Sequence, residues 1–352
     1  MLIVNERLEV REIEEVDWDA LVDQCPLGTV YHRVGWIGVL SVCEGVEIKL
    51  VACFRGDELV AVWPIGILRK GPMRVGGSPL PGWNTAYLGP VFAQKYCGDQ
   101  QLKLDAMKKM IKSKPISNPA FVATRCMDVD LDLSAIGFEK SRDFETYEID
   151  LTRDEDDLFA ALKGTCRTRV RKGTKNGLVV RVEEDAGYID DFWEMASDVF
   201  VKSRQKPPYS KRFLGMVHER LFAKGELLVT SAFKDDERIA TLIIPHDGKT
   251  GMYFAGGTFA SKLSLAPNNL LHWETMMACK RLGMTRYDFI SNRGKPGKFK
   301  KTFQPDERVS CVHWERSKNP IVKWMREGYE KRARNQRRIS HPIDANRDGG
   351  GA

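Results

Sequence analysis

Two side chains near the end of the chain have types that could support acyl transfer. Asp288 lies in an apolar, strand-like run (residues 287–290), and a Gly- and Lys-rich segment with Lys298 and Lys300 follows it. A carboxylate can orient or deprotonate an attacking amine or hydroxyl, and a lysine can stabilise the oxyanion of a tetrahedral intermediate. We therefore predict Asp288 and Lys300 as catalytic residues and Lys298 as a substrate contact. A buried structural carboxylate is an equally good interpretation of Asp288.

The segment around Pro267 predicts an anion-binding helix end. Pro267, Asn268 and Asn269 precede an apolar run, and we expect Pro267 with an Asn cap to begin a helix there. The free N–H groups of such an end can bind a pyrophosphate or a carboxylate. Asn268 and Asn269 are accordingly predicted as substrate-binding residues, with ordinary helix capping as the alternative.

A basic segment opens the second half of the chain. Arg167 and Arg171 are four residues apart, so they share one face of a helix. Two guanidinium groups there could hold a phosphate or a carboxylate. We predict both arginines as substrate-binding residues, and a solvated basic helix is the alternative.

An aromatic, Gly- and Pro-rich stretch covers residues 76–92. Loops of this kind often carry binding residues on a rigid scaffold. We predict Trp83, Tyr87 and Gly89 as substrate-binding residues in the wall of a cleft. Aromatic packing in a loop between strands is the alternative.

Two similar hairpin patterns, about half the chain apart, indicate a duplication. Residues 50–65 (LVACFRGDELVAVWPI) and 229–244 (VTSAFKDDERIATLII) each read as strand, charged turn and strand, with Phe54 aligned to Phe233. Two helical patterns precede each hairpin, and a helix and a strand follow it. This order predicts a mixed α/β fold of two tandem domains, each a twisted mixed sheet flanked by helices.

The domain limits follow from this repeat. Thr152 and Glu155 have the spacing of a capping box ahead of a helix, so the boundary is expected near Thr152. We predict an N-terminal domain over residues 1–151, a C-terminal catalytic domain over 152–318, and a basic helix with a disordered tail over 319–352.

Composition and missing motifs exclude several function classes. The sequence has no G-x-S-x-G, H-E-x-x-H or P-loop motif, and neither its six His nor its eight Cys have metal-site spacing. We expect no metal, reduced cysteines and a cytoplasmic protein, since no signal peptide or membrane-spanning run is visible. The net charge of +7 owes much to the segment KWMREGYEKRARNQRR. That segment would suit tRNA or an anionic membrane surface, or would simply be a solvated helix.

Several of these motifs together resemble the Fem family of aminoacyltransferases and the related acetyltransferases of the GNAT superfamily. The resemblance rests on PNNLLHWETMMACKRLGMTRYDF, on GKFKKTFQP, and on the R-x-x-x-R-K-x-x-K-N-G-L-V-V segment. It implies two tandem GNAT-like domains, and it matches the family's F-K lysine to Lys300 and its Y-D-F aspartate to Asp288. Phe92-Ala93 follows Gly89-Pro90-Val91 where bridge-forming members carry an Asp, so the chain is closer to the acetyltransferases.

These observations give one leading function and two alternatives. The leading hypothesis is an acyltransferase that moves an acyl group, acetyl above all, from acyl-CoA to an amine or hydroxyl of a cell-envelope or small-molecule acceptor. The first alternative is an aminoacyltransferase that uses aminoacyl-tRNA on a peptidoglycan precursor. The second is a non-catalytic ligand-binding protein that retains the fold.

Overall fold

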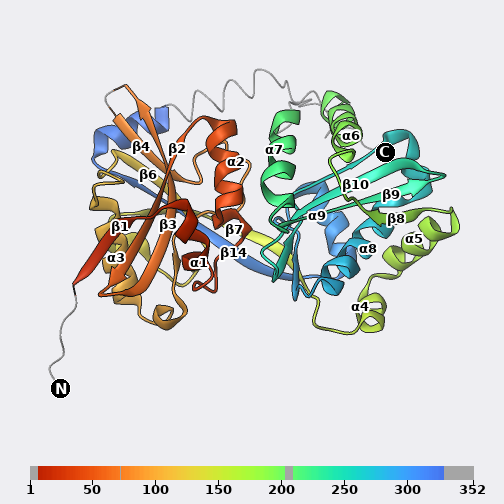
Figure 1. The fold of residues 1–352 in the computed structure, drawn as a ribbon, viewed down its shortest axis with the longest axis horizontal. Helices are drawn as coiled ribbons and strands as arrows, with labels where there is room; N and C mark the ends of the chain where they lie inside the picture. Colours follow the sequence, from red (N-terminus) through yellow and green to blue (C-terminus); the bar gives the residue numbers. More distant parts are fainter. Residues whose placement is uncertain (1–6, 72, 203–208, 329–352) are drawn as a thin grey trace, which may run out of the picture.

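The computed structural model describes residues 7–71, 73–202 and 209–328. Within these ranges the chain is a mixed α/β protein of two lobes, as predicted (Figure 1). Of the predicted basic C-terminal segment, residues 320–328 are helical, and the remainder lies outside the described residues. No helix in the described ranges has the length and apolarity needed to cross a bilayer.

The first half begins with a strand and two helices and continues through a hairpin into the rest of its sheet. Its main elements are β1 (Leu8–Glu12), α1 (Glu15–Val22), α2 (Val34–Glu44), β2 (Glu47–Arg55), β3 (Glu58–Lys70), β4 (Met73–Ser78), β5 (Val91–Phe92), α3 (Gln100–Lys112), β6 (Phe121–Cys126) and β7 (Glu139–Asp150).

The second half repeats this order after two short helices. Its elements are α4 (Glu155–Ala161), α5 (Gly164–Lys175), β8 (Val179–Val182), α6 (Tyr188–Lys202), α7 (Lys211–Phe222), β9 (Leu227–Lys234), β10 (Glu237–Pro245), β11 (Thr250–Met252), β12 (Ala255–Thr258), α8 (Pro267–Arg281), β13 (Arg286–Asp288), α9 (Gly294–Lys300) and β14 (Asp306–Ser317).

The duplicated hairpins form as predicted, β2 with β3 and β9 with β10. Each half also has a strand that the sequence patterns missed. β1 pairs with β2, and β8 pairs with β9, both antiparallel, ahead of the two helices in chain order. Both are edge strands with mostly exposed or half-buried residues. Edge strands of this kind have a weak apolar pattern, which explains why they were missed.

The last strand of each half pairs with strands of the other half. β14 lies between β6 and β7 in a ten-stranded sheet, and β7 in turn pairs with β13 of the second half. Figure 1 shows β7 and β14 crossing together between the lobes. A division of the chain near Thr152 therefore places β14 with the second half in sequence, although it pairs with strands of the first.

A shared hydrophobic core joins the lobes. Each half has its own cluster of buried side chains, and a third cluster lies between α2 and α7. Trp36 on α2 packs edge-on against Phe213 on α7, with ring centroids 6.0 Å apart, and against Phe254 at 5.2 Å. This apolar contact fixes the two halves relative to each other.

The four-stranded second sheet parts from the large sheet at Tyr253. β11 pairs in parallel with β13, so that Met252 lies opposite Asp288, whereas β12 pairs with β10. Tyr253 N donates to Asp288 O (2.8 Å), and Phe254 N donates to Ile243 O (3.2 Å). The chain thus passes from the large sheet to the second sheet within two residues. The two sheets separate beside the end of β13.

Two predicted helix caps are wrong. Thr152 does not cap α4, because its hydroxyl donates to Asp150 Oδ1 (2.7 Å) and Asp154 holds the cap position. Helix α8 begins at Pro267, as predicted, but Ala266 precedes it and no side chain caps it. The proline satisfies the start of α8 without an Asn cap, because it has no N–H to be bonded.

Candidate active site between the two halves

Asp288 is a buried carboxylate that ties together segments from both halves. Its Oδ2 accepts a hydrogen bond from Tyr87 Oη (2.8 Å), and its Oδ1 accepts from Thr146 Oγ1 (2.5 Å) and Ile290 N (2.6 Å). The residue is 1% exposed. Three donors occupy a carboxylate that water does not reach, so the geometry suits a role in positioning the cleft wall rather than in exchanging protons with a substrate.

Lys300, at the end of α9, is buried close to Asp288. Its Nζ donates to the carbonyl oxygens of Phe289 (2.8 Å) and Ser291 (3.0 Å) and lies 5.1 Å from the centre of the Tyr253 ring. Burial lowers the pKa of this ammonium group to about 8, although the nearby Asp288 opposes the shift. Two of the three Nζ protons are thus bonded to backbone carbonyl groups.

His272 lies behind Lys300 in an aromatic cluster. Its ring packs against Tyr253, Phe289, Phe299 and Phe303, with centroids between 4.7 and 5.6 Å apart. Burial, together with the charge of Lys300, lowers the pKa of His272 to about 3. The imidazole is therefore neutral at physiological pH, and this cluster provides an apolar backing for the lysine.

A cleft between the halves opens above these groups. We call this cavity of about 290 Å³ the interdomain cleft. Its lining comes from both halves: Tyr31, Trp83, Asn84, Thr85, Ala86, Tyr87, Arg125, Phe144, Glu145, Phe254, Ile290, Ser291 and Arg293. Trp83 and Tyr87, both predicted as substrate contacts, lie in its wall.

Gly89 supports the cleft from behind. A Cβ atom at this position would lie 1.9 Å from the carbonyl oxygen of Arg125. The backbone of residue 89 therefore packs directly on the strand that carries Arg125, and its carbonyl oxygen lies 3.1 Å from His32 Nε2. Gly89 does not line the cleft but allows the wall to close.

An arginine cluster at the cleft was missed by the sequence analysis. The guanidinium carbons of Arg125, Arg142 and Arg293 lie 4.6, 4.5 and 5.8 Å from the centre of the Phe144 ring. Arg125 donates to the carbonyl oxygens of Thr85 and Ala86, and burial, with the charge of Arg142, lowers its pKa. In the described ranges no carboxylate pairs with these three cations, so the cluster can receive an anionic group.

These arginines come from three strands or loops, so their spacing along the chain carried no signal. Arg125 belongs to β6, Arg142 to β7, and Arg293 precedes α9. β6 and β7 lie on either side of β14 in the sheet. The inserted strand and the crossing of the chain bring the three side chains around one phenyl ring.

A second cavity, of about 540 Å³, lies at the start of α8 and is called the α8 cavity here. Asn268 and Asn269, both predicted as substrate-binding residues, line it together with Arg169 and Thr302. Asn269 Nδ2 contacts Cys166 Sγ at 3.2 Å, and Asn268 Oδ1 accepts from Thr258 Oγ1 at 2.5 Å. Both amides help to shape the cavity.

The arginines of α5 divide between two faces. Arg167 donates to the carbonyl oxygens of Ala160 (2.6 Å) and Leu162, and Arg171 lies over the ring of Phe159 at 5.4 Å. Both side chains are therefore occupied with α4. Arg169, between them in sequence, lies on the other face and lines the α8 cavity. The spacing of four residues correctly placed Arg167 and Arg171 on one helix face. That face, however, packs against α4.

Helix α9 separates the two cavities. Phe299 and Thr302 line the α8 cavity, whereas Lys300 reaches Ser291 in the wall of the interdomain cleft. Lys298 is exposed and lines none of the described cavities. Lys300 is therefore the lysine of this segment that lies between a potential donor site and a potential acceptor site.

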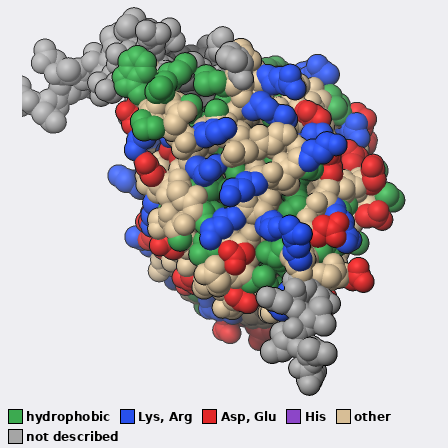
Figure 2. Space-filling view, turned by 90° about the vertical axis from the view of Figure 1, so that its left-hand side faces the viewer, with side chains coloured by type: hydrophobic (Ala, Val, Ile, Leu, Met, Phe, Trp, Pro, Cys, Tyr) green, Lys and Arg blue, Asp and Glu red, His purple; other side chains and the backbone are tan. Residues whose placement is uncertain are grey.

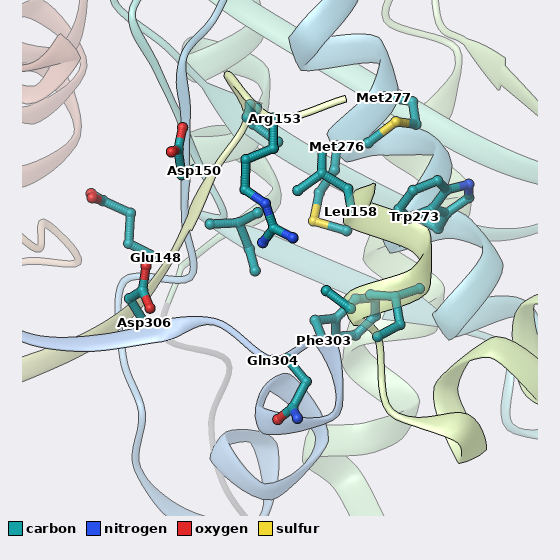
Figure 3. Close-up of a pocket in the computed structure, with 14 residues that line it drawn as sticks. Glu148, Asp150, Arg153, Leu158, Trp273, Met276, Met277, Phe303, Gln304 and Asp306 are labelled. Atoms are coloured by element: carbon teal, nitrogen blue, oxygen red, sulfur yellow. The ribbon is translucent and has the colours of Figure 1, made fainter. Parts of the chain in front are cut away.

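A third cavity, of about 110 Å³, lies where β7, α4, α8 and β14 meet. Figure 3 shows Glu148, Asp150 and Asp306 on one side of it and Trp273, Met276 and Phe303 on the other. Its volume is too small for a drug-sized ligand, so it is not the substrate site. Among the described residues no group of three or more His, Cys, Asp or Glu could hold a metal ion.

Comparison with known proteins identifies the type of domain. Residues 160–301 match the model of the acetyltransferase (GNAT) domain family. No curated protein sequence matches the chain. The match covers α8, β13 and α9, which carry Asp288 and Lys300, and it supports an acyltransferase, as predicted.

Solved structures show the same two-domain arrangement. FemX has a TM-score of 0.73 at 14% identity and covers 90% of this chain and 99% of its own. A tandem GNAT protein from the clavulanic acid biosynthesis pathway has a TM-score of 0.54 at 10% identity, with 89% and 99% coverage. The L-PGS of Bacillus licheniformis has a TM-score of 0.54 at 12% identity, with 90% and 96% coverage. At these identities the likeness shows the fold, and it confirms the predicted Fem-like tandem of GNAT-like domains.

Proposed function

We propose, from the GNAT acyltransferase domain in its second half, that this chain transfers an acyl group from acyl-CoA to an amine or hydroxyl of an anionic acceptor. The donor would enter from the α8 cavity, and the acceptor would occupy the interdomain cleft. The observation that carries the proposal is the place of Lys300, buried next to Phe299 of the α8 cavity and bonded to the carbonyl oxygen of Ser291 in the wall of the interdomain cleft. Domain interfaces are common places for such sites.

Lys300 would stabilise the negative charge that develops during transfer. Attack of the acceptor nitrogen or oxygen on the thioester carbonyl forms the new bond to carbon and places negative charge on the carbonyl oxygen. The third Nζ proton of Lys300 would donate to this oxygen in a site with little water. The C–S bond then breaks, and the thiol leaves with the proton that the acceptor has lost.

Asp288 is assigned a positioning role. It fixes Tyr87 of the cleft wall and the backbone at Ile290, next to the carbonyl groups that hold Lys300. A carboxylate with three donors keeps these groups in place at little cost in conformational entropy. Its loss would displace both the cleft wall and the lysine.

The arginine cluster suggests the chemistry of the acceptor. Three guanidinium groups around Phe144, none with a carboxylate partner among the described residues, suit a phosphate or a carboxylate near the group that is acylated. Cell-envelope precursors and small acidic metabolites both carry such groups.

An aminoacyl-tRNA donor is the second candidate. It is favoured by basic residues of α5: Arg169, which lines the α8 cavity, and the exposed Lys172 and Lys175. Phosphate contacts from these residues would make donor binding steeply dependent on salt.

A donor screen by mass spectrometry tests the proposal. The full chain is incubated with acetyl-CoA, a longer acyl-CoA or charged tRNA, each with a panel of anionic amines and alcohols. We expect an acylated product with an acyl-CoA and a loss of about 10²- to 10³-fold in kcat for Lys300→Met. Lys298→Met, an exposed neighbour on the same helix, is the matched control and should retain activity. Transfer from tRNA alone would select the second candidate, and transfer from none would favour a non-catalytic binding protein.

The acceptor assignment has its own test. Arg142→Gln with Arg293→Gln removes two exposed cations of the cluster and should raise the KM for an anionic acceptor about tenfold or more, since charge-assisted hydrogen bonds are lost. Arg281→Gln, exposed at the end of α8, is the control. An unchanged KM in the double variant would exclude the cluster from acceptor binding.

A further inference from the structure

Three apolar side chains of the helix of residues 320–328 are exposed. Ile321, Trp324 and Met325 are 68%, 74% and 45% exposed. Their spacing of three and four residues places them on one face of the helix. A surface helix normally buries such a face, so this arrangement is the reverse of the usual one.

Polar contacts hold the helix on the first half in this orientation. Lys323 Nζ pairs with Glu139 (2.7 Å), and Arg326 pairs with Glu315 (2.5 Å). Arg326 also lies over the ring of Phe121, with its guanidinium carbon 4.7 Å from the ring centre. The charged side faces the sheet, and the apolar side is left for a partner.

The apolar surface continues into a groove beside the helix. A cavity of about 610 Å³ is lined by Val322 and Met325 of the helix and by apolar residues of the first half, among them Leu68, Val75 and Trp83. Trp83 also lines the interdomain cleft. Trp83 is thus common to the linings of this groove and of the proposed acceptor site.

Helix α3, on the same left-hand side of Figure 1, carries further basic side chains. Lys108, Lys109, Lys112 and Lys114, on α3 and just after it, are exposed, and among the described residues only Lys108 has an ion pair, with Asp105 at 3.4 Å. The turn after α3 leads to β6, against whose first residue, Phe121, the helix packs. Figure 2 shows this side of the molecule, with hydrophobic side chains gathered at one edge and many Lys and Arg side chains across the face.

The chain that follows adds more positive charge. Residues 329–338 read YEKRARNQRR, with five Lys or Arg and one Glu. This segment begins directly at the end of the helix with the exposed apolar face. In the sequence, a run of positive charge therefore follows the helix that exposes these apolar side chains.

We propose that this surface, the helix of residues 320–328 with the lysines of α3, docks on an anionic lipid bilayer. Exposed Trp and aliphatic side chains on one helix face insert at the interface between headgroups and acyl chains. The Lys and Arg on this side of the molecule are complementary to anionic headgroups. A nucleic acid would match the charge, but it offers no environment for Ile321 and Met325, so the bilayer is the better partner. Docking would bring the interdomain cleft close to acceptors in the membrane.

Vesicle co-sedimentation of the full chain tests this inference. We expect binding to vesicles of phosphatidylcholine with phosphatidylglycerol, little binding to phosphatidylcholine alone, and weakening with salt. Ile321→Ser with Trp324→Ser should reduce binding about tenfold or more. The matched control is Leu282→Ser, 59% exposed on the second half, which should bind as the unaltered chain does. Lys109→Gln with Lys112→Gln should also weaken binding, whereas Lys172→Gln with Lys175→Gln on α5 should not.

Three results would overturn the inference. They are no binding to anionic vesicles at low salt, equal binding to neutral and anionic vesicles, and binding that the Ile321 and Trp324 substitutions leave unchanged. The surface would be assigned to nucleic acid instead if the unaltered chain bound tRNA but no vesicles, and if the Ile321 and Trp324 substitutions abolished the tRNA binding. The docking helix is outside the proposed active site, so acylation of a water-soluble acceptor should survive its substitutions. Failure of docking is thereby distinguished from failure of the proposed function.

Discussion

Removal of the Tyr87 hydroxyl is expected to destabilise the protein more than the loss of an ordinary surface hydrogen bond. Tyr87→Phe keeps the ring, but it leaves Asp288 Oδ2 without its donor at 2.8 Å. The carboxylate is 1% exposed, so water cannot replace the hydroxyl. Hydrogen bonds to charged groups contribute about 1.5–3 kcal/mol, and we expect a loss of that size in the free energy of unfolding. Asp288→Ala leaves three hydrogen-bond donors without an acceptor. It should lower the free energy of unfolding by about 3–5 kcal/mol.

Guanidinium chloride unfolding, followed by tryptophan fluorescence, measures these changes. Tyr96→Phe is the matched control, since the Tyr96 hydroxyl bonds to Glu58, whose side chain is 53% exposed, and an exposed pair contributes about 0–1 kcal/mol. In the variant that carries both substitutions, the two losses in the free energy of unfolding should not add. Once Asp288 is replaced, the tyrosine hydroxyl has no acceptor, so its removal costs little more. A coupling of about 0.5–3 kcal/mol is expected. The reasoning fails if Tyr87→Phe costs no more than Tyr96→Phe, or if the two losses are additive.

Three further outcomes are expected. Burial lowers the pKa of Lys300 to about 8, and the protonated form is the proposed active one, so kcat should fall as pH rises through about 8. Lys300→Arg should move this fall to higher pH, and an unchanged pH profile would contradict the role. Gly89→Ala places a Cβ 1.9 Å from the carbonyl oxygen of Arg125 and should lower the free energy of unfolding by about 1–3 kcal/mol or more, measured by denaturant unfolding. Arg169→Gln should raise the KM for acyl-CoA, whereas Arg171→Gln, which lies on the face turned to α4, should leave it unchanged; equal effects would exclude a donor site in the α8 cavity.

Much of the fold could be predicted because its signals are local. The hairpins at Phe54 and Phe233, the helices around them and the start of α8 at Pro267 all follow from patterns a few residues long. Where the local pattern was weak, the prediction failed. β1 and β8 are exposed edge strands, and the two predicted caps were wrong because Asp154 holds the cap position of α4 and no side chain caps α8.

The candidate site was only partly predictable. Asp288 and Lys300 were found from residue type and position at a strand end, and the structure brings them close together. Arg169 was overlooked in favour of Arg167, because periodicity shows which residues share a helix face but not what that face contacts. The cluster at Phe144 was missed altogether, because its arginines are far apart in sequence.

The sequence by itself determined the type of fold, the duplication and the acyltransferase class of the second half. These properties depend on apolar periodicity, turn residues and short motifs, which act over a few residues. Only the tertiary structure decided which side chains meet. The exchange of β7 and β14 brings Tyr87 and Thr146 to Asp288 and gathers three arginines around Phe144. Long-range strand pairing leaves no trace in local sequence patterns, because its free energy comes from contacts between residues that are distant along the chain.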